Sequence, residues 1–287
     1  MRGILWMLAT MLCFITLDAI MKHLLESYSL VQVTWARFFF ATIIAVVVCS
    51  KNLRSLARSK TPGKQVLRSF LLMSTTGMFN AGIRTTPLAT ATTIMFLSPI
   101  LITLLSIPLL GEKVGFRRWA GIIVGFTGAT IVVEPWHGGM GGVGLGVLFL
   151  LVAALLNANY QIVTRMVRED DPLTSLLFTA TAGALVTSLI VPWFWSWPTA
   201  SAWLLLIGSG LAGAIGHLCL IRALRLAPAS VVAPFSYSSL VWATLFGFVV
   251  WGDWPNFWTW TGAILIIGSG LYIFHRERRH ISVAVEA

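Results

Sequence analysis

The chain has 287 residues, of which 57% are hydrophobic and only 10% are charged, and its mean hydropathy is +0.85. A soluble domain carries about 25% charged residues, so this composition argues against a water-soluble protein and predicts a surface that faces lipid. The net charge of +10 would suit a nucleic-acid-binding protein, but the distribution of the basic residues, described below, favours contact with lipid head groups instead.

Apolar stretches of membrane-spanning length follow one another along the whole chain. A helix needs about 20 apolar residues to cross the ~30 Å hydrocarbon layer. The sequence predicts an all-α integral membrane protein with ten such helices, at residues 3–22, 30–49, 67–85, 88–110, 117–134, 143–164, 172–192, 201–221, 229–250 and 257–275. The longest loop, residues 50–65, is too short and too basic to fold alone.

The first two spans contain charged residues at membrane depth. Asp18 and Lys22 are four residues apart, and therefore lie on one face of the first helix. Arg37 lies about seven residues into the second span, roughly 10 Å deep at 1.5 Å per residue. We expect an ion-pair cluster that joins these two helices. The alternative is a functional role, in which Asp18 titrates or the three residues gate the outer mouth.

Prolines interrupt two later spans. Pro99 and Pro234 lie within the fourth and ninth spans, where each is expected to bend its helix. Carriers place their substrate sites beside broken helices near the membrane midplane. Polar and aromatic residues near this depth are therefore candidates for a substrate cavity: Asn80, Ser98, Tyr160, His217, Tyr237 and Trp242. Hydrogen bonding between helices is the alternative role for the polar members of this set.

The chain divides into two similar halves. A shift of 141 residues places Arg84 to Glu134, without a gap, on Arg225 to His275, so that Ser98 meets Ser239. The expected units are residues 1–135 and 143–276, joined by a glycine-rich external linker at 136–142 and followed by a cytoplasmic tail at 277–287. A repeat of five spans must insert its second copy upside down, which gives two inverted five-helix repeats.

The basic residues predict how the chain is oriented. With the N-terminus in the cytoplasm, the outer ends of the spans contain only Lys22 and Arg84. Seventeen other lysines and arginines lie in the inner loops or at the inner ends of the spans: Arg2, Lys51, Arg54, Arg58, Lys60, Lys64, Arg68, Lys113, Arg117, Arg118, Arg165, Arg168, Arg222, Arg225, Arg276, Arg278 and Arg279. This asymmetry predicts a multi-pass protein of the bacterial inner membrane with both termini in the cytoplasm.

Catalytic motifs are missing from the sequence. It contains no P-loop lysine motif, no H-E-x-x-H and no nucleophile elbow, and Cys13, Cys49 and Cys219 do not have metal-ligand spacing. We therefore expect no enzyme activity, no cofactor and no metal. An integral-membrane lipid enzyme is a minor alternative, but it would need acid, base or metal-ligating residues near one interface.

Motifs of the two halves resemble a known family. Gly111-Glu112 precedes Trp119-x-Gly121, Gly252-Asp253 precedes Trp260-x-Gly262, and the run from Arg222 to Tyr237 completes the pattern. The chain resembles the EamA-domain branch of the drug/metabolite transporter superfamily, and within it bacterial exporters of aromatic amino acids. The resemblance implies an inverted pseudo-twofold axis, with a central cavity lined by spans one, three, four, six, eight and nine.

The resulting hypothesis is a secondary transporter that works by alternating access. It would export small organic metabolites, with amino acids, including aromatic ones, as the expected class. Import of S-adenosylmethionine, or of a cationic or drug-like compound, is the alternative. Asp18 and His217 are the obvious candidate proton carriers, and exchange down a gradient is the other means of coupling. The expected partners are a small-molecule substrate and membrane lipid, with no nucleic acid, in a monomer or homodimer.

Overall fold

The computed structural model describes residues 2–110, 116–134, 144–167, 169–227 and 229–285, and these residues contain helices and no strand. The first half comprises α1 (Arg2–Leu24), α2 (Leu30–Cys49), η1 (Ser50–Asn52), α3 (Leu53–Leu56), α4 (Pro62–Ile83), α5 (Leu88–Met95), α6 (Leu97–Leu110) and α7 (Phe116–Val133). The second comprises α8 (Leu145–Met166), α9 (Pro172–Ile190), η3 (Val191–Phe194), α10 (Ala200–Leu226), α11 (Ala229–Val232), η4 (Ala233–Tyr237), α12 (Ser238–Phe246), η5 (Gly247–Trp251) and α13 (Phe257–Val285).

These elements account for the ten predicted spans. The fourth span is α5 with α6, and the ninth runs from α11 through η4 and α12 to η5. Seven segments are long and apolar enough to cross a membrane. The other three are α4, which is more polar, and α7 and α13, whose apolar parts are shorter. Helix α13 continues to Val285, so the predicted tenth span and the expected tail are largely one helix.

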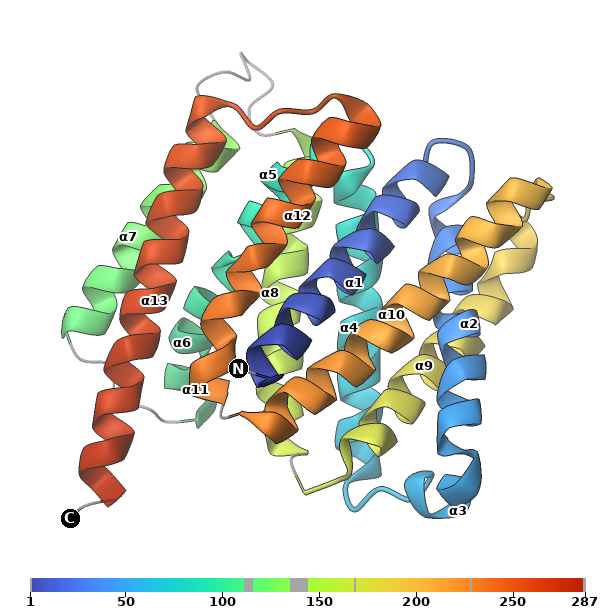
Figure 1. Cartoon of the computed structure of the whole chain (residues 1–287), viewed down its shortest axis with the longest axis horizontal. Helices are drawn as coiled ribbons and strands as arrows, with labels where there is room; N and C mark the ends of the chain where they lie inside the picture. The colour runs from blue at the N-terminus through green and yellow to red at the C-terminus, as the bar shows by residue number, and fades with distance from the viewer. Residues whose placement is uncertain (1, 111–115, 135–143, 168, 228, 286–287) are drawn as a thin grey trace.

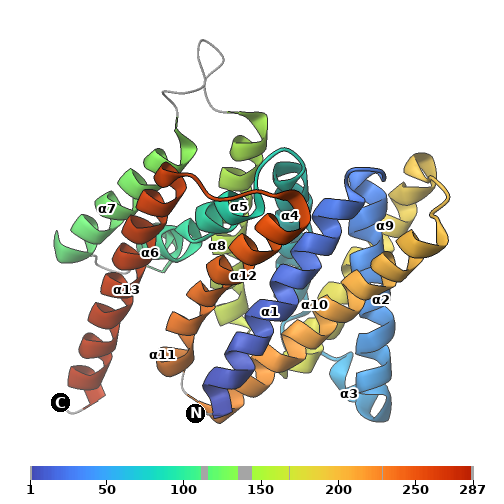
Figure 2. The same cartoon turned by 45° about the horizontal axis from the view of Figure 1, so that its top comes forward.

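Helix pairs obey the symmetry of the repeat. Helix α1 packs against α10, and its equivalent α8 packs against α4; likewise α2 packs against α9, and α7 against α13. Figures 1 and 2 show α7 and α13 at one side of the molecule, α2 and α9 at the other, and the remaining long helices between them. Helix α1 begins at the end that carries α3, whereas α8 begins at the opposite end (Figure 1), so the two halves are inverted.

Small residues bring the paired helices together at equivalent positions. A Cβ atom added to Gly146 would lie 3.1 Å from the carbonyl oxygen of Gly82, and one added to Gly3 would lie 3.2 Å from that of Ala223. Shifts of 141 and 143 residues relate Gly82 to Ala223 and Gly3 to Gly146. Backbones approach this closely in lipid only where the side chains are small. The same close approach therefore fixes α1 on α10 and α4 on α8.

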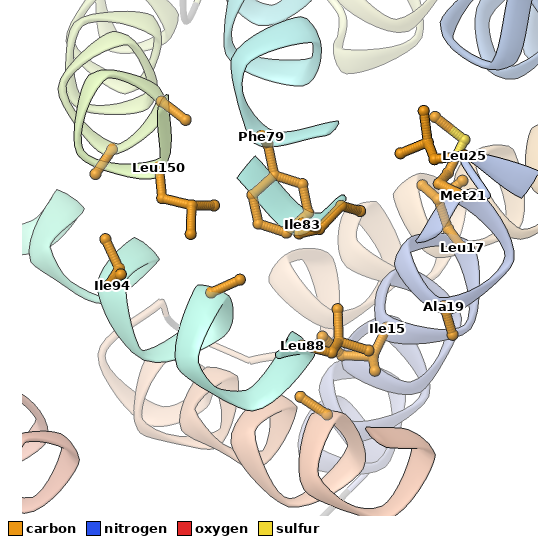
Figure 3. Packing of buried hydrophobic residues seen from close by; sticks show 14 of the residues in the cluster. Ile15, Leu17, Ala19, Met21, Leu25, Phe79, Ile83, Leu88, Ile94 and Leu150 are labelled. Carbon is orange, nitrogen blue, oxygen red and sulfur yellow. The ribbon is translucent and has the colours of Figure 1, made fainter. Parts of the chain in front are cut away.

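The largest apolar cluster extends across the bundle and includes residues of α1, α4, α5 and α8. Leu17 and Met21 of α1, Ile83 of α4, Ile94 of α5 and Leu150 of α8 are all at most 1% exposed. Figure 3 shows these side chains distributed through the space between the helices. Other apolar side chains, such as Leu204 on α10, lie on the outer surface and would face lipid. Side chains of the central helices thus provide most of the packing in the interior of the bundle.

The two ends of the molecule differ in composition. One end, here called the basic end, carries the exposed side chains of Arg2, Lys51, Arg54, Arg58, Lys60, Lys64, Arg165, Arg222 and Arg225. The other, here called the tryptophan end, carries exposed Trp193, Trp197, Trp254 and Trp258. Helix α1 begins and helix α13 ends at the basic end (Figure 1). A bilayer places amphipathic indole rings at head-group depth, so the direction from the basic end to the tryptophan end, along which the helices run, crosses the membrane.

Candidate functional site

Asp18 and Arg37 form the centre of the candidate site. Asp18 lies on α1 and Arg37 on α2, both well inside their helices, and both side chains are only partly buried. They interact electrostatically, but no ion pair within 4.0 Å joins either of them to any residue that the structure describes. Charges at this depth are costly in hydrocarbon and therefore face the interior. The two groups thus leave charge available for a ligand.

Lys22 differs from the sequence prediction. The spacing predicted an ion pair with Asp18, but the Nζ atom of Lys22 lies 3.3 Å from Oδ2 of Asp253, in the loop between η5 and α13. Nζ also donates a hydrogen bond to the carbonyl oxygen of Thr86 at 3.1 Å. The physical reason is position: Lys22 lies at the tryptophan end of α1, where its side chain reaches the neighbouring loops. The predicted cluster of Asp18, Lys22 and Arg37 is therefore divided.

Arg68 is a buried cation that sequence reasoning assigned to a flanking loop. It lies on α4 and is only 7% exposed. Its guanidinium donates to Thr164 Oγ1 at 2.9 Å, Ser175 O at 3.1 Å, Thr179 Oγ1 at 2.6 Å and Tyr160 Oη at 2.7 Å. None of these acceptors is a carboxylate, so the hydrogen bonds solvate the charge without neutralising it. The sequence signal for this inward position was that Arg68 lies about two turns inside a polar helix.

Tyr160 and His217 connect these two regions. The ring of Tyr160 lies 4.8 Å from the guanidinium carbon of Arg68, and Tyr160 also interacts electrostatically with Arg37. His217, on α10, is partly buried and interacts electrostatically with both arginines, while its ring meets the edge of Phe14 at 5.0 Å. Polar groups therefore extend through the interior from Asp18 to Arg68. We call Asp18, Arg37, Tyr160, His217 and Arg68 the polar column.

Breaks in two spans bring aromatic residues together. Pro99 has no N–H to donate to the carbonyl of Met95, and α5 ends at Met95 before α6 begins at Leu97. Pro234 lies in η4, which precedes α12. The ring of Tyr237 meets that of Phe96 edge to face, with centroids 4.9 Å apart. The breaks thus place aromatic surface from both repeats at one point.

Trp242 has an unsatisfied donor. It lies on α12, and its buried Nε1 atom has no hydrogen-bond partner among the described residues. The Oγ atom of Ser238, one turn earlier on the same helix, is also buried without one. Buried polar atoms normally have partners, so this face of α12 has hydrogen-bonding capacity that a ligand or water could use.

Asn80 and Ser98 lie in helix contacts. Asn80 is fully buried, and its Nδ2 atom donates to Thr34 Oγ1 of α2 at 3.0 Å. Ser98 is 2% exposed; it donates to the carbonyl of Ala154 on α8 at 3.2 Å and accepts from Asn157 at 3.1 Å. In this conformation both side chains hold helices together, which is the alternative role that the sequence analysis gave them.

A surface cavity of about 470 Å³ lies at the basic end, apart from the polar column. Charged side chains line it, among them Arg58, Lys60 and Asp170. It opens between α3 and the loop that joins α8 to α9, so it does not connect the two membrane faces. Within the described residues, no group of three or more His, Cys, Asp or Glu side chains could hold a metal ion.

Comparison with known proteins identifies the family. The model of the EamA-like transporter family matches residues 1–134 and 144–274. An S-adenosylmethionine uptake transporter of Rickettsia prowazekii (strain Madrid E) is 27% identical over 98% of this chain and 95% of its own length. A riboflavin transporter of Vibrio cholerae serotype O1 is 28% identical, over 97% and 95%. One crystal structure shares the fold, with a TM-score of 0.63 and 21% identity over 94% of this chain and 98% of its own.

Proposed function

This chain belongs to the EamA-like transporter family, and we propose that it takes up a small metabolite with an amino-acid end group, with S-adenosylmethionine as the first candidate. The family transports small molecules and is not a family of enzymes, so a lipid enzyme is no longer an alternative. The proposed orientation has the basic end in the cytoplasm, as the positive-inside rule favours.

The observation that carries the proposal is the relation between Asp18 and Arg37. A carboxylate and a guanidinium from neighbouring spans interact across the interior without an ion pair between them. An amino-acid end group carries an ammonium and a carboxylate close together, and can give each residue an opposite charge. Charge-assisted hydrogen bonds are the strong ones, and Arg binds carboxylates in a two-pronged geometry. The pair therefore suits a zwitterionic ligand.

Charge balance argues against the purely cationic compounds among the alternatives. The polar column contains two guanidinium groups, of Arg37 and Arg68, and one carboxylate, of Asp18. A cation without a carboxylate would add positive charge to a site that already has an excess of it. S-adenosylmethionine also has a net positive charge, but its carboxylate can bind a guanidinium, which a purely cationic compound cannot do. Riboflavin has neither an ammonium nor a carboxylate. We expect the aromatic side chains of Tyr237 and Trp242 to contact the ring of such a substrate.

Export of amino acids is the second candidate. An aromatic amino acid has the same end group, and would engage Asp18 and Arg37 in the same way. The relatives named as uptake transporters favour import of the larger metabolite. The direction of transport and the size of the ring system in the substrate therefore separate the two candidates, and both can be measured.

The test is uptake of radiolabelled S-adenosylmethionine by cells or proteoliposomes that contain the protein. We expect saturable uptake that unlabelled S-adenosylmethionine inhibits and that riboflavin and quaternary amines do not. Asp18→Asn and Arg37→Gln should each lower the uptake by at least about tenfold, because each removes one charge-assisted contact. The control Arg84→Gln, at an exposed residue outside the column, should transport normally.

Two outcomes would contradict this proposal. Absence of protein-dependent S-adenosylmethionine uptake, together with efflux of preloaded phenylalanine or tryptophan, would support the exporter instead. Normal uptake by both Asp18→Asn and Arg37→Gln would remove the proposed recognition of the end group, even if S-adenosylmethionine were the substrate.

A further inference from the structure

Lys22 joins three segments at the tryptophan end. Its side chain is 10% exposed, and its Nζ atom contacts Asp253 Oδ2 at 3.3 Å and the carbonyl of Thr86 at 3.1 Å. The same atom lies 4.9 Å from the centre of the Trp251 ring, a cation–π distance. Trp251 in turn donates from Nε1 to Oε1 of Glu26 at 2.7 Å. A buried ammonium with this many partners fixes the segments that provide them.

These contacts cross between the two repeats. Lys22, Glu26 and Thr86 belong to the first repeat, whereas Trp251 and Asp253 belong to the second. They connect the end of α1 with the loop before α5 and with the η5–α13 loop. Helix α5 precedes the break in the fourth span, and α12 follows the break in the ninth. The Lys22 contacts therefore close the space between the repeats on the tryptophan side.

Other contacts between the repeats occur at both ends at once. At the tryptophan end, Gln32 exchanges hydrogen bonds with Ser196 at 2.7 and 3.1 Å. At the basic end, Asp170 accepts from Gln65 at 2.9 Å and from the backbone of Lys60 at 2.9 Å. Contacts that are formed at both ends in one conformation do not distinguish an open end from a closed one. These two sets hold the α2 and α9 side of the bundle together.

Lys22 and its equivalent in the second repeat behave differently. A shift of 143 residues places Lys22 on Arg165 and Glu26 on Glu169. Lys22 is buried, whereas Arg165 is exposed at the basic end and forms no ion pair with any described residue. Among the described residues, the same position of the repeat is thus paired at one end and exposed without an ion pair at the other. An inverted-repeat carrier that opens one end at a time requires such a difference.

We propose that the Lys22–Asp253 ion pair is the external gate of the transport cycle. It closes the tryptophan end in this conformation and must break before that end opens. Thr86 and Trp251 orient the ammonium while the gate is closed. The Asp253 side chain is 35% exposed, so water can solvate its carboxylate when the pair opens during turnover, while the buried Lys22 ammonium makes the closed state specific.

The gate is tested by accessibility from outside. Met95, on α5, is partly buried and lies about two turns below the tryptophan end of its helix. A cysteine at this position, in a variant without Cys13, Cys49 and Cys219, reports opening through its rate of reaction with a membrane-impermeant maleimide. We expect Lys22→Met and Asp253→Asn each to raise this rate at least about fivefold. Lys22→Arg should keep it near the parent value, because arginine retains the charge.

Charge reversal provides a second comparison. Lys22→Asp and Asp253→Lys should each speed labelling, because each places two like charges at the gate. Lys60→Met, which removes the exposed 3.8 Å contact with Glu169, is the control and should change nothing. Unchanged labelling in folded Lys22→Met and Asp253→Asn would overturn the gate. The measurement uses no substrate, so its outcome is independent of the proposed uptake of S-adenosylmethionine.

Discussion

Phe96 and Tyr237 occupy equivalent positions of the two repeats, 141 residues apart, and their rings touch edge to face at 76° with centroids 4.9 Å apart. Equivalent residues of two inverted copies can meet only close to the axis that relates the copies. This contact therefore locates the pseudo-twofold axis at the breaks of the fourth and ninth spans. Both breaks lie there because the same position of the repeat interrupts its helix in each copy.

The contact between Phe96 and Tyr237 should be measurable as a coupling energy. Edge-to-face aromatic pairs contribute roughly 0.5–1.5 kcal/mol beyond the area that they bury. In a double-mutant cycle of Phe96→Ala and Tyr237→Ala, we expect a coupling of about 1 kcal/mol in the free energy of unfolding in detergent. Tyr237→Phe retains the ring and should retain the coupling. Strictly additive effects of the two alanine variants would show that the rings do not interact.

Helix α13 packs so closely against α7 that a side chain at Gly262 of α13 should not fit. A Cβ atom there would lie 2.5 Å from the carbonyl oxygen of Gly128, which is backbone and cannot move aside. We expect Gly262→Ala to lower the free energy of unfolding by roughly 1–3 kcal/mol, the usual cost of overpacking. A Cβ atom added to Gly268, on the same helix, would meet nothing within 4 Å, so Gly268→Ala is a matched control. Equal thermal midpoints for both variants would contradict the close approach.

Removing the charge of Arg68 should destabilise the fold. Arg68→Gln cannot form the four hydrogen bonds that reach Tyr160, Thr164, Ser175 and Thr179. Buried groups left without partners cost about 1–3 kcal/mol, so we expect a loss of about 2–3 kcal/mol in unfolding free energy. Lys64→Gln changes an exposed cation one turn earlier and should have little effect. A stability loss no larger than that of Lys64→Gln would mean that the network contributes nothing.

Acid should weaken the contact of Asp170 with the α3–α4 loop. Burial acts to raise the pKa of Asp170, but hydrogen bonds from Gln65, Ser59 and the backbone of Lys60, with the Lys60 charge, outweigh it and lower the pKa below its ordinary value. A carboxyl whose pKa is lower in the folded state stabilises the fold above its unfolded pKa. That contribution is lost as the pH falls through the folded pKa.

The measurement compares the parent protein with Asp170→Asn between about pH 7 and about pH 3. The parent should be the more stable at neutral pH, and the difference should shrink as the carboxyl becomes protonated. Glu169→Gln changes an exposed neighbour and should give a difference that varies little with pH. A difference for Asp170→Asn that is constant across the range would contradict the lowered pKa.

The sequence predicted the fold well because the fold depends on patterns that are local or repeated. Apolar length located the spans, and the 141-residue shift revealed the inversion. The break in the fourth span shows the limit of a local rule: the helix is interrupted at Phe96 rather than at Pro99, since a proline removes the hydrogen bond to the residue four positions earlier.

The site was less predictable because its partners are distant in sequence. Helical spacing correctly placed Asp18 and Lys22 on one face, but Asp253, which pairs with Lys22, is 231 residues away. Arg68 was grouped with the flanking cations, because composition alone cannot distinguish a cation that faces lipid head groups from one that turns inward. Only the packing of α4 against α8 and α9 brings hydroxyl and carbonyl acceptors around it.

Labelling from the two sides of the membrane tests most directly whether the repeats lie in opposite senses across the bilayer. Single cysteines at Lys60, at the basic end, and at Gly144, before α8, would be introduced into the variant without native cysteines. A membrane-impermeant reagent added outside intact cells should modify the cysteine at position 144 and leave position 60 unmodified until the membrane is opened. Modification of both positions from the same side would contradict the inverted arrangement, and with it the solute path between the repeats.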